Sequence, residues 1–243
     1  MKAYYQEIAP DYARLRRVHP EVFRHLIADG PIHLDSRVLE IGCGTGNYIC
    51  GLQETVRCNC SGIDPSENML AEAKARSTTV RFMQASAEKL DFPPDAFDLI
   101  FSVDVVHHLT GRTQAFREAH RVLRRDGRLC TVTDSEEILR NRHPQSVYFP
   151  ETVAVELARY PAIGALEKEL TEAGFSQLVR TQVEFTKKLE SLEPYRARVY
   201  SSLRLIPQDA FDRGMARLEN DFKKGPVSWV SRYLMLWATK AAF

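Results

Sequence analysis

Short apolar runs alternate with helical segments through the middle of the chain, and this alternation constrains the fold more than any other feature. The spacing predicts strands at 37–41, 56–63, 80–83, 97–103 and 129–133. Between them it predicts a helix at 45–53, a helix opening at Pro65, and a helix at 111–125. Strands separated by helices form βαβ units, so we expect a parallel sheet with helices on both faces.

The two ends of the chain follow different patterns. Residues 1–30 are predicted to be helical, with a break at Pro10 and a second helix after Pro20. The last third is predicted to hold helices at 151–159 and 163–172, strands at 179–185 and 229–237, and a helical segment at 190–225. No linker separates a second domain, so residues 1–243 are expected to form one unit.

A glycine-rich loop, Gly42-Cys43-Gly44-Thr45-Gly46, follows the first predicted strand and opens a helix. Glycine lets a ligand approach the backbone closely, and the helix N-terminus offers free N–H groups. A dinucleotide fingerprint, G-x-G-x-x-G, requires glycine at position 47, where this chain has Asn47. Asp64 ends the next strand and is placed to accept hydrogen bonds from two ribose hydroxyls. The alternative is that Asp64 only caps the helix that follows it.

Five segments together resemble the class I S-adenosylmethionine-dependent methyltransferases. They correspond to motif I, the ribose-binding segment, the adenine-edge segment, the strand-4 motif and the turn into strand 5, at 38–46, 62–70, 85–90, 97–109 and 121–128. The chain is most similar to the small-molecule branch that includes the ubiquinone and menaquinone biosynthesis methyltransferases. The resemblance implies a Rossmann-like, seven-stranded, mostly parallel sheet with strand 7 antiparallel. It also implies S-adenosyl-L-methionine as the cofactor.

The resemblance further implies where that cofactor binds. Glu40 and the glycine loop would hold the methionine end, and Asp64 would bind the ribose. Ser86 stands where the family often has an acidic residue for the adenine amino group, so Glu88 is an alternative acceptor there. The full set of implied cofactor-binding residues is Tyr12, Glu40, Gly42, Cys43, Gly44, Gly46, Asp64, Pro65, Met69, Ser86, Ala87, Glu88 and Ser102.

His107 and His108 follow the fourth strand and are the candidates for a catalytic base, because an unperturbed imidazole titrates near pH ~6.5. The alternative is that one or both only pack or cap a helix. Residues 1–30 are interpreted as a helical lid, and 190–225 as a helical insertion over the acceptor site. The residues proposed to contact the acceptor are Tyr5, Tyr148, Arg196 and Tyr200. The alternative for Arg196 and Tyr200 is a solvated helix face.

The composition and charge of the chain argue against several classes of function. The chain has 33 basic and 32 acidic residues, a net charge of +1, so no overall charge attracts nucleic acid or an anionic membrane. Its five cysteines include no C-x-x-C pair, so neither a metal site nor a disulfide framework is expected. No membrane span or signal-peptide pattern is visible, which favours a cytoplasmic protein. The sequence therefore predicts methyl transfer to a small molecule. The alternatives are an NAD-dependent oxidoreductase and a non-catalytic S-adenosylmethionine-binding protein.

Overall fold

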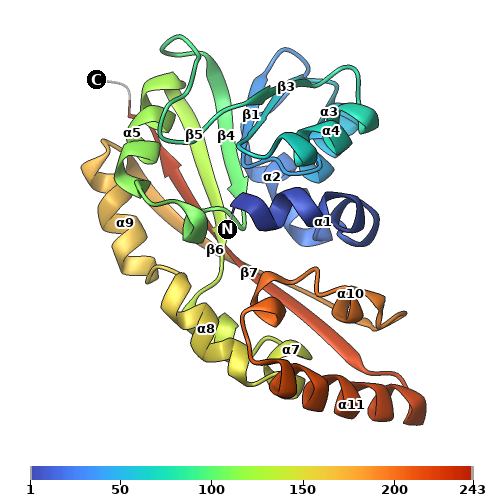
Figure 1. The fold of residues 1–243 in the computed structure, drawn as a ribbon. Helices are drawn as coiled ribbons and strands as arrows, with labels where there is room; N and C mark the ends of the chain where they lie inside the picture. The colour runs from blue at the N-terminus through green and yellow to red at the C-terminus, as the bar shows by residue number, and fades with distance from the viewer. Residues whose placement is uncertain (1, 242–243) are drawn as a thin grey trace.

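Seven strands form one sheet in the computed structural model, which describes residues 2–241 and the side chains of residues 9–241. The sheet order is β3-β2-β1-β4-β5-β7-β6 (Figure 1). β1 to β5 pair in parallel, whereas β7 is antiparallel to both of its neighbours, β5 and β6. The expected fold is confirmed. The strands are β1 (Arg37–Ile41), β2 (Asn59–Asp64), β3 (Arg81–Gln84), β4 (Phe97–Val103), β5 (Leu123–Thr133), β6 (Ser176–Lys188) and β7 (Ser228–Thr239).

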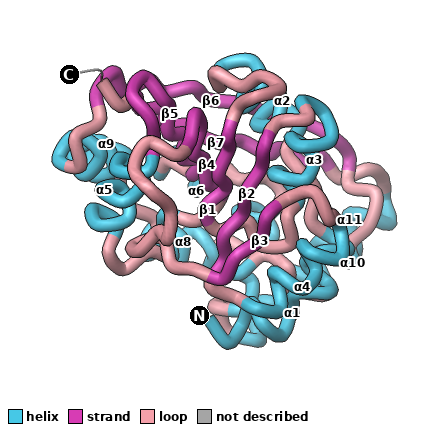
Figure 2. Tube along the Cα trace, turned by 90° about the horizontal axis from the view of Figure 1, so that it is seen from above, coloured by secondary structure: helices cyan, strands magenta, loops and turns pink. Residues whose placement is uncertain are grey.

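Helices cover both faces of the sheet, with α2 and α3 on one side and α5 and α9 on the other (Figure 2). Successive residues of a strand point to opposite faces, so β1 places Val38 in the first layer and Leu39 in the second. The helices are α1 (Lys2–Leu15), α2 (Pro20–Asp29), α3 (Asn47–Val56), α4 (Glu67–Arg76), η1 (Val106–His108), α5 (Arg112–Val122), α6 (Glu136–Arg140), α7 (Gln145–Tyr148), α8 (Glu151–Arg159), α9 (Ile163–Glu172), α10 (Glu193–Arg196), η2 (Ser201–Arg204) and α11 (Gln208–Lys224).

α1 runs through Pro10 without ending there, so the expected break at that residue is wrong. Proline removes one backbone hydrogen bond from a helix interior, which is a limited cost when packing supports the segment. That support comes from Ala9 and Tyr12, which pack against Met69 of α4.

β6 and β7 are 13 and 12 residues long, and they extend past the parallel strands toward α10 and α11 (Figure 1). The segment between them is helical, as expected, but divides into α10, η2 and α11. Pro207 precedes α11 and contributes to this division, because the residue before a proline is disfavoured in a helix. A separate apolar cluster that includes Phe149, Tyr195 and Leu218 holds this segment together.

Candidate functional site

The glycine loop adopts backbone conformations that require glycine. Gly42 and Gly46 have φ angles of +69° and +77°, in the left-handed region. A Cβ at Gly42 would lie 2.5 Å from Cγ2 of Val105. The loop therefore packs directly against the segment that follows β4, and α3 begins immediately after it at Asn47.

Asp64 links the end of β2 to this loop. Its Oδ2 accepts the Gly44 N–H at 2.9 Å, and its Oδ1 accepts the Ser66 N–H at 2.8 Å. Burial raises the pKa of the Asp64 carboxyl, and the two backbone donors act in the opposite direction. A carboxylate offers about four lone-pair sites, so both oxygens can accept a further hydrogen bond.

A cavity of about 600 Å³ lies in front of the loop. Ser86 and Glu88 border it with their side chains in contact, so the serine does not act there alone. Nine of the implied cofactor residues line this cavity: Tyr12, Gly42, Gly44, Asp64, Pro65, Met69, Ser86, Ala87 and Glu88. We call it the cofactor cavity.

The remaining implied residues lie elsewhere. Glu40 and Cys43 border a neighbouring cavity of about 380 Å³, whose walls include the glycine loop. Glu40 Oε2 accepts the Ile49 N–H at 3.0 Å, and burial raises the pKa of this carboxyl well above its usual range. Gly46 and Ser102 line neither cavity, and the Ser102 hydroxyl pairs with Thr131 at 2.8 Å.

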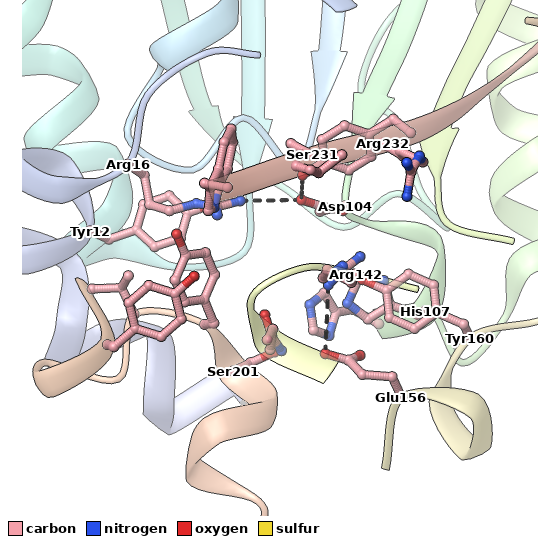
Figure 3. A pocket seen from close by; sticks show the side chains of 18 residues that line it. Tyr12, Arg16, Asp104, His107, Arg142, Glu156, Tyr160, Ser201, Ser231 and Arg232 are labelled. Carbon is pink, nitrogen blue, oxygen red and sulfur yellow. Dashed lines mark hydrogen bonds and ion pairs between the residues drawn. The ribbon is translucent and has the colours of Figure 1, made fainter. Parts of the chain in front are cut away.

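A third, smaller cavity of about 90 Å³ lies beside the cofactor cavity (Figure 3). Tyr12 and Asp104 line all three cavities. Asp104 directly follows β4 with φ +58°, a left-handed conformation that aspartate tolerates better than most residues. Its Oδ2 accepts the Tyr233 hydroxyl at 2.7 Å and Nη2 of Arg16 at 3.3 Å. Asp104 therefore stands at the junction of the cavities, with one carboxylate oxygen bonded to Tyr233 and Arg16.

His107 and His108 both reach the small cavity, and His108 also borders the cofactor cavity. The His107 ring stacks on Tyr160 with centroids 3.9 Å apart and an interplanar angle of 19°. Burial lowers the pKa of His107 well below its usual range and lowers that of His108 to about 4. Both imidazoles are therefore neutral at pH 7.

Arg142 and Glu156 line the small cavity, and each also forms a buried ion pair with a residue outside its lining. Arg142 contacts Asp134. Arg142 Nη1 also lies 4.0 Å from Oε1 of Glu156 (Figure 3). Arg159 Nη1 lies 3.7 Å from Oε2 of the same glutamate and donates to Ser201 Oγ at 3.1 Å. Burial raises the pKa of Asp134 to about 6.

The proposed acceptor residues separate into two groups. Tyr200 lines the small and the 380 Å³ cavities, and Arg16 lies over its ring at 5.3 Å. Tyr148 and Arg196 line none of the three cavities: Tyr148 donates to Asp221 at 3.1 Å, and Arg196 pairs with Glu219 on α11. Tyr5 belongs to α1, but its side chain lies outside those that the structure describes.

Several lining residues were not predicted from the sequence, and Asp104 is the one that a sequence signal could have identified. It is an acidic residue at the carboxyl end of a buried parallel strand, where ligands bind in such folds. Arg142, Glu156 and Tyr160 belong to loops and helices with no distinguishing pattern. Across residues 2–241 the structure shows neither a helix suited to crossing a membrane nor three or more His, Cys, Asp or Glu side chains grouped to hold a metal.

Comparison with known proteins agrees with this geometry. Residues 39–131 match the methyltransferase domain family. The uncharacterized methyltransferase YcgJ of Bacillus subtilis is 35% identical over 112 residues, 44% of each chain. The ubiquinone/menaquinone biosynthesis C-methyltransferase UbiE of Campylobacter jejuni is 34% identical over 104 residues, 40% of this chain and 44% of that protein. The matched region thus spans less than half the length of these relatives.

A solved structure extends the likeness in fold to the whole chain. Phosphoethanolamine N-methyltransferase 2 of Haemonchus contortus, in complex with S-adenosyl-L-methionine, superposes with a TM-score of 0.60 at 19% identity. The superposition covers 100% of this chain and 58% of the Haemonchus chain. Residues 39–131 are therefore similar to the methyltransferase domain family, and the chain as a whole shares its fold with this S-adenosyl-L-methionine-bound structure.

Proposed function

We propose that this protein transfers a methyl group from S-adenosyl-L-methionine to a small-molecule acceptor. One observation carries the proposal: the cofactor cavity, bordered by the glycine loop and Asp64, meets two smaller cavities at Tyr12 and Asp104. A volume of about 600 Å³ lies within the range of small-molecule sites. A cofactor and a small acceptor can thus be held side by side.

The residues present fit this cofactor. The unused lone pairs of Asp64 would accept the two ribose hydroxyls, while its existing backbone bonds keep the carboxylate in place. Pro65 and Met69 would supply apolar contacts to the adenine, and the Ala87 N–H would donate to it. Ser86 and Glu88 would together accept from the adenine amino group. The methionine end would lie at the glycine loop, with Glu40 behind it in the adjoining cavity.

The cofactor, when bound, supplies an electrophilic methyl group on a sulfonium that is already a good leaving group. The chain then has to align the acceptor and exclude water, and such positioning is a large catalytic contribution. Tyr12 is placed for both tasks, because it borders all three cavities at the end of α1. In this proposal the α1 part of residues 1–30 acts as the lid, because α2 packs against the sheet. Residues 190–201 of the 190–225 segment cover the acceptor, because α11 lines none of the three cavities. His107 and His108, being neutral, would accept or donate hydrogen bonds.

Calorimetric titration tests the cofactor assignment. S-adenosylmethionine and S-adenosylhomocysteine are expected to bind with micromolar affinity, and NAD, the matched control, is not. Binding of NAD alone would overturn the proposal and favour the oxidoreductase alternative. Methyl transfer is then measured with a labelled methyl group against a panel of small acceptors. Binding of the cofactor without transfer to any acceptor would favour a non-catalytic binding protein.

A further inference from the structure

The small cavity described above limits which part of an acceptor it can hold. About 90 Å³ is well below the size of a complete small-molecule site, so it accommodates a head group. Asp104 and His108 border both this cavity and the cofactor cavity. A group bound between them therefore lies next to the methyl donor that the proposed function requires.

Among the described residues that line this cavity, Asp104 and Glu156 each have one carboxylate oxygen without a hydrogen bond. Oδ1 of Asp104 and Oε2 of Glu156 are buried, and neither receives a hydrogen bond from the described part of the chain. Buried polar atoms are paired in the great majority of native structures. An ionised carboxylate only accepts, so the missing partner must be a donor. The terminal torsions of these side chains are soft, so each oxygen can turn toward an arriving ligand.

The neighbours of each carboxylate leave this oxygen without a hydrogen bond. Tyr233 and Arg16 both donate to the other oxygen of Asp104, at 2.7 and 3.3 Å. Glu156 is 5% exposed, and its ion pairs are longer than hydrogen bonds: Arg159 Nη1 lies 3.7 Å from Oε2, and Arg142 Nη1 lies 4.0 Å from Oε1. The cavity can therefore accept hydrogen bonds at Asp104, which also borders the cofactor cavity, and at Glu156, which does not.

Charge balance indicates the kind of donor. The two histidines are neutral, and the surrounding arginines are matched one for one by carboxylates. The arginines are Arg16, Arg142, Arg159 and Arg232, and the carboxylates are Asp104, Asp134, Glu156 and Glu184. An ammonium or a carboxylate would add an unmatched charge to a desolvated site, which is costly. A hydroxyl group donates without adding charge.

We propose, on the basis of the proposed function, that the acceptor is an uncharged molecule with at least two hydroxyl groups, and that an oxygen is methylated. One hydroxyl donates to Asp104 and the other to Glu156. The hydroxyl oxygen at Asp104 forms a bond to the methyl carbon of the cofactor. The bond from that carbon to sulfur breaks, with its electron pair remaining on sulfur. The hydroxyl proton passes to the Asp104 carboxylate and then to solvent.

Four matched probes test this assignment by calorimetry, with S-adenosylhomocysteine bound: catechol, cis-1,2-cyclohexanediol, benzylamine and benzoate. At least one diol is expected to bind, with both charged probes at least tenfold weaker. The two diols distinguish a phenolic from an alcoholic acceptor. Equal or tighter binding of benzylamine or benzoate would overturn the proposal, as would failure of both diols at millimolar concentration. If S-adenosylhomocysteine itself does not bind, the proposed function fails, and the probes are titrated against the free protein.

Two isosteric variants assign the hydroxyl sites. In Asp104→Asn the amide oxygen accepts hydrogen bonds from Tyr233 and Arg16, so the amide NH₂ is directed toward the cavity. Because this NH₂ is itself a donor, it cannot accept a hydrogen bond from the hydroxyl group of the diol. Diol affinity is expected to fall at least tenfold. Glu156→Gln leaves one positive charge unmatched, so benzoate is expected to gain at least tenfold relative to the diols. Glu136→Gln, an exposed glutamate paired with Arg140, is the matched control and should leave every affinity unchanged.

Retained S-adenosylhomocysteine binding in each variant shows that it is folded. Wild-type diol affinity in both Asp104→Asn and Glu156→Gln would contradict the assignment. A methylation readout completes the test: with a ¹³C-methyl cofactor, the diol that binds should give an ether carbon in the NMR spectrum. Transfer of the label to benzylamine in preference to that diol would place the reaction on nitrogen and refute the proposal.

Discussion

The cofactor cavity and the small cavity beside it share Tyr12 and Asp104, yet the chain builds their walls differently. Most of the cofactor cavity comes from contiguous segments at the carboxyl ends of β1, β2 and β4, fixed by backbone conformations and backbone hydrogen bonds. The small cavity is formed by side chains from α1, η1, α8 and β7 that meet through ion pairs and ring contacts. The lining of the cofactor cavity is thus determined by local sequence, whereas the lining of the small cavity depends on tertiary packing.

The substitution Gly42→Ala tests the part of the cofactor cavity that the backbone forms, and it should have the largest effect on stability. The added Cβ meets Val105 at 2.5 Å, and the φ of +69° disfavours any L side chain. Together these effects should lower the free energy of unfolding by about 2–5 kcal/mol, measured by urea denaturation. Gly164→Ala is the control, because nothing lies within 4 Å of its Cβ position and its stability should not fall. Equal stability of the two variants would show that the loop conformation is not constrained.

The second prediction concerns His108, whose side chain lines the small cavity. Its folded pKa of about 4 lies below the ordinary value of 6.5, so between these values the unfolded chain binds a proton that the folded chain does not. Stability from this group is therefore complete above pH 6.5 and is lost as the pH falls toward 4. The loss is about 2–3 kcal/mol.

Denaturation of the wild type and of His108→Asn, at about pH 7 and about pH 4.5, measures this dependence. The variant should lose less stability between the two conditions than the wild type does. His33→Asn, at an exposed position, should behave like the wild type. An identical acid dependence in His108→Asn and the wild type would mean that this ring is not desolvated by the cavity.

The substitution Asp64→Ala tests how much this carboxylate contributes to cofactor binding. The ribose hydroxyls would lose their acceptor, so affinity for S-adenosylmethionine should fall by about 1–3 kcal/mol, roughly 5–150-fold. Calorimetry measures the change, and Asp35→Ala, at an exposed position, is the control. Unchanged affinity in Asp64→Ala would leave this carboxylate with the capping role at Ser66 alone.

Arg196→Ala should have the smallest effect. Its guanidinium pairs with Glu219 on the surface, and exposed pairs contribute about 0–1 kcal/mol. Both the free energy of unfolding and the turnover of any identified acceptor should change little. A loss of turnover beyond tenfold would bring α10 into the acceptor site and restore the sequence-based assignment of Arg196.

This contrast explains how far the sequence could predict the molecule. The strands at 37–41 and 97–103 and the glycine loop were predictable because their signals are local: apolar runs, glycines and an acid at a strand end. Glu156 could not be predicted, since its partners come from distant segments and its own helix shows only an ordinary amphipathic pattern. Tyr148 was predicted as an acceptor residue from its position after the fifth strand, and Arg196 from the Arg- and Tyr-rich composition of its segment. Contacts with α11 direct both side chains elsewhere.

The position of β7 inside the sheet has a consequence for how the molecule is assembled. It is the last strand along the described chain, yet it lies between β5 and β6, and its residues Ser231 and Tyr233 line the small cavity. During synthesis the parallel strands emerge first, with β5 unpaired on one side and β6 without its neighbour. Such open edges invite association with other chains until they are covered. The cofactor cavity, which β7 does not line, is thus encoded early in synthesis, while the small cavity is completed only when β7 enters the sheet.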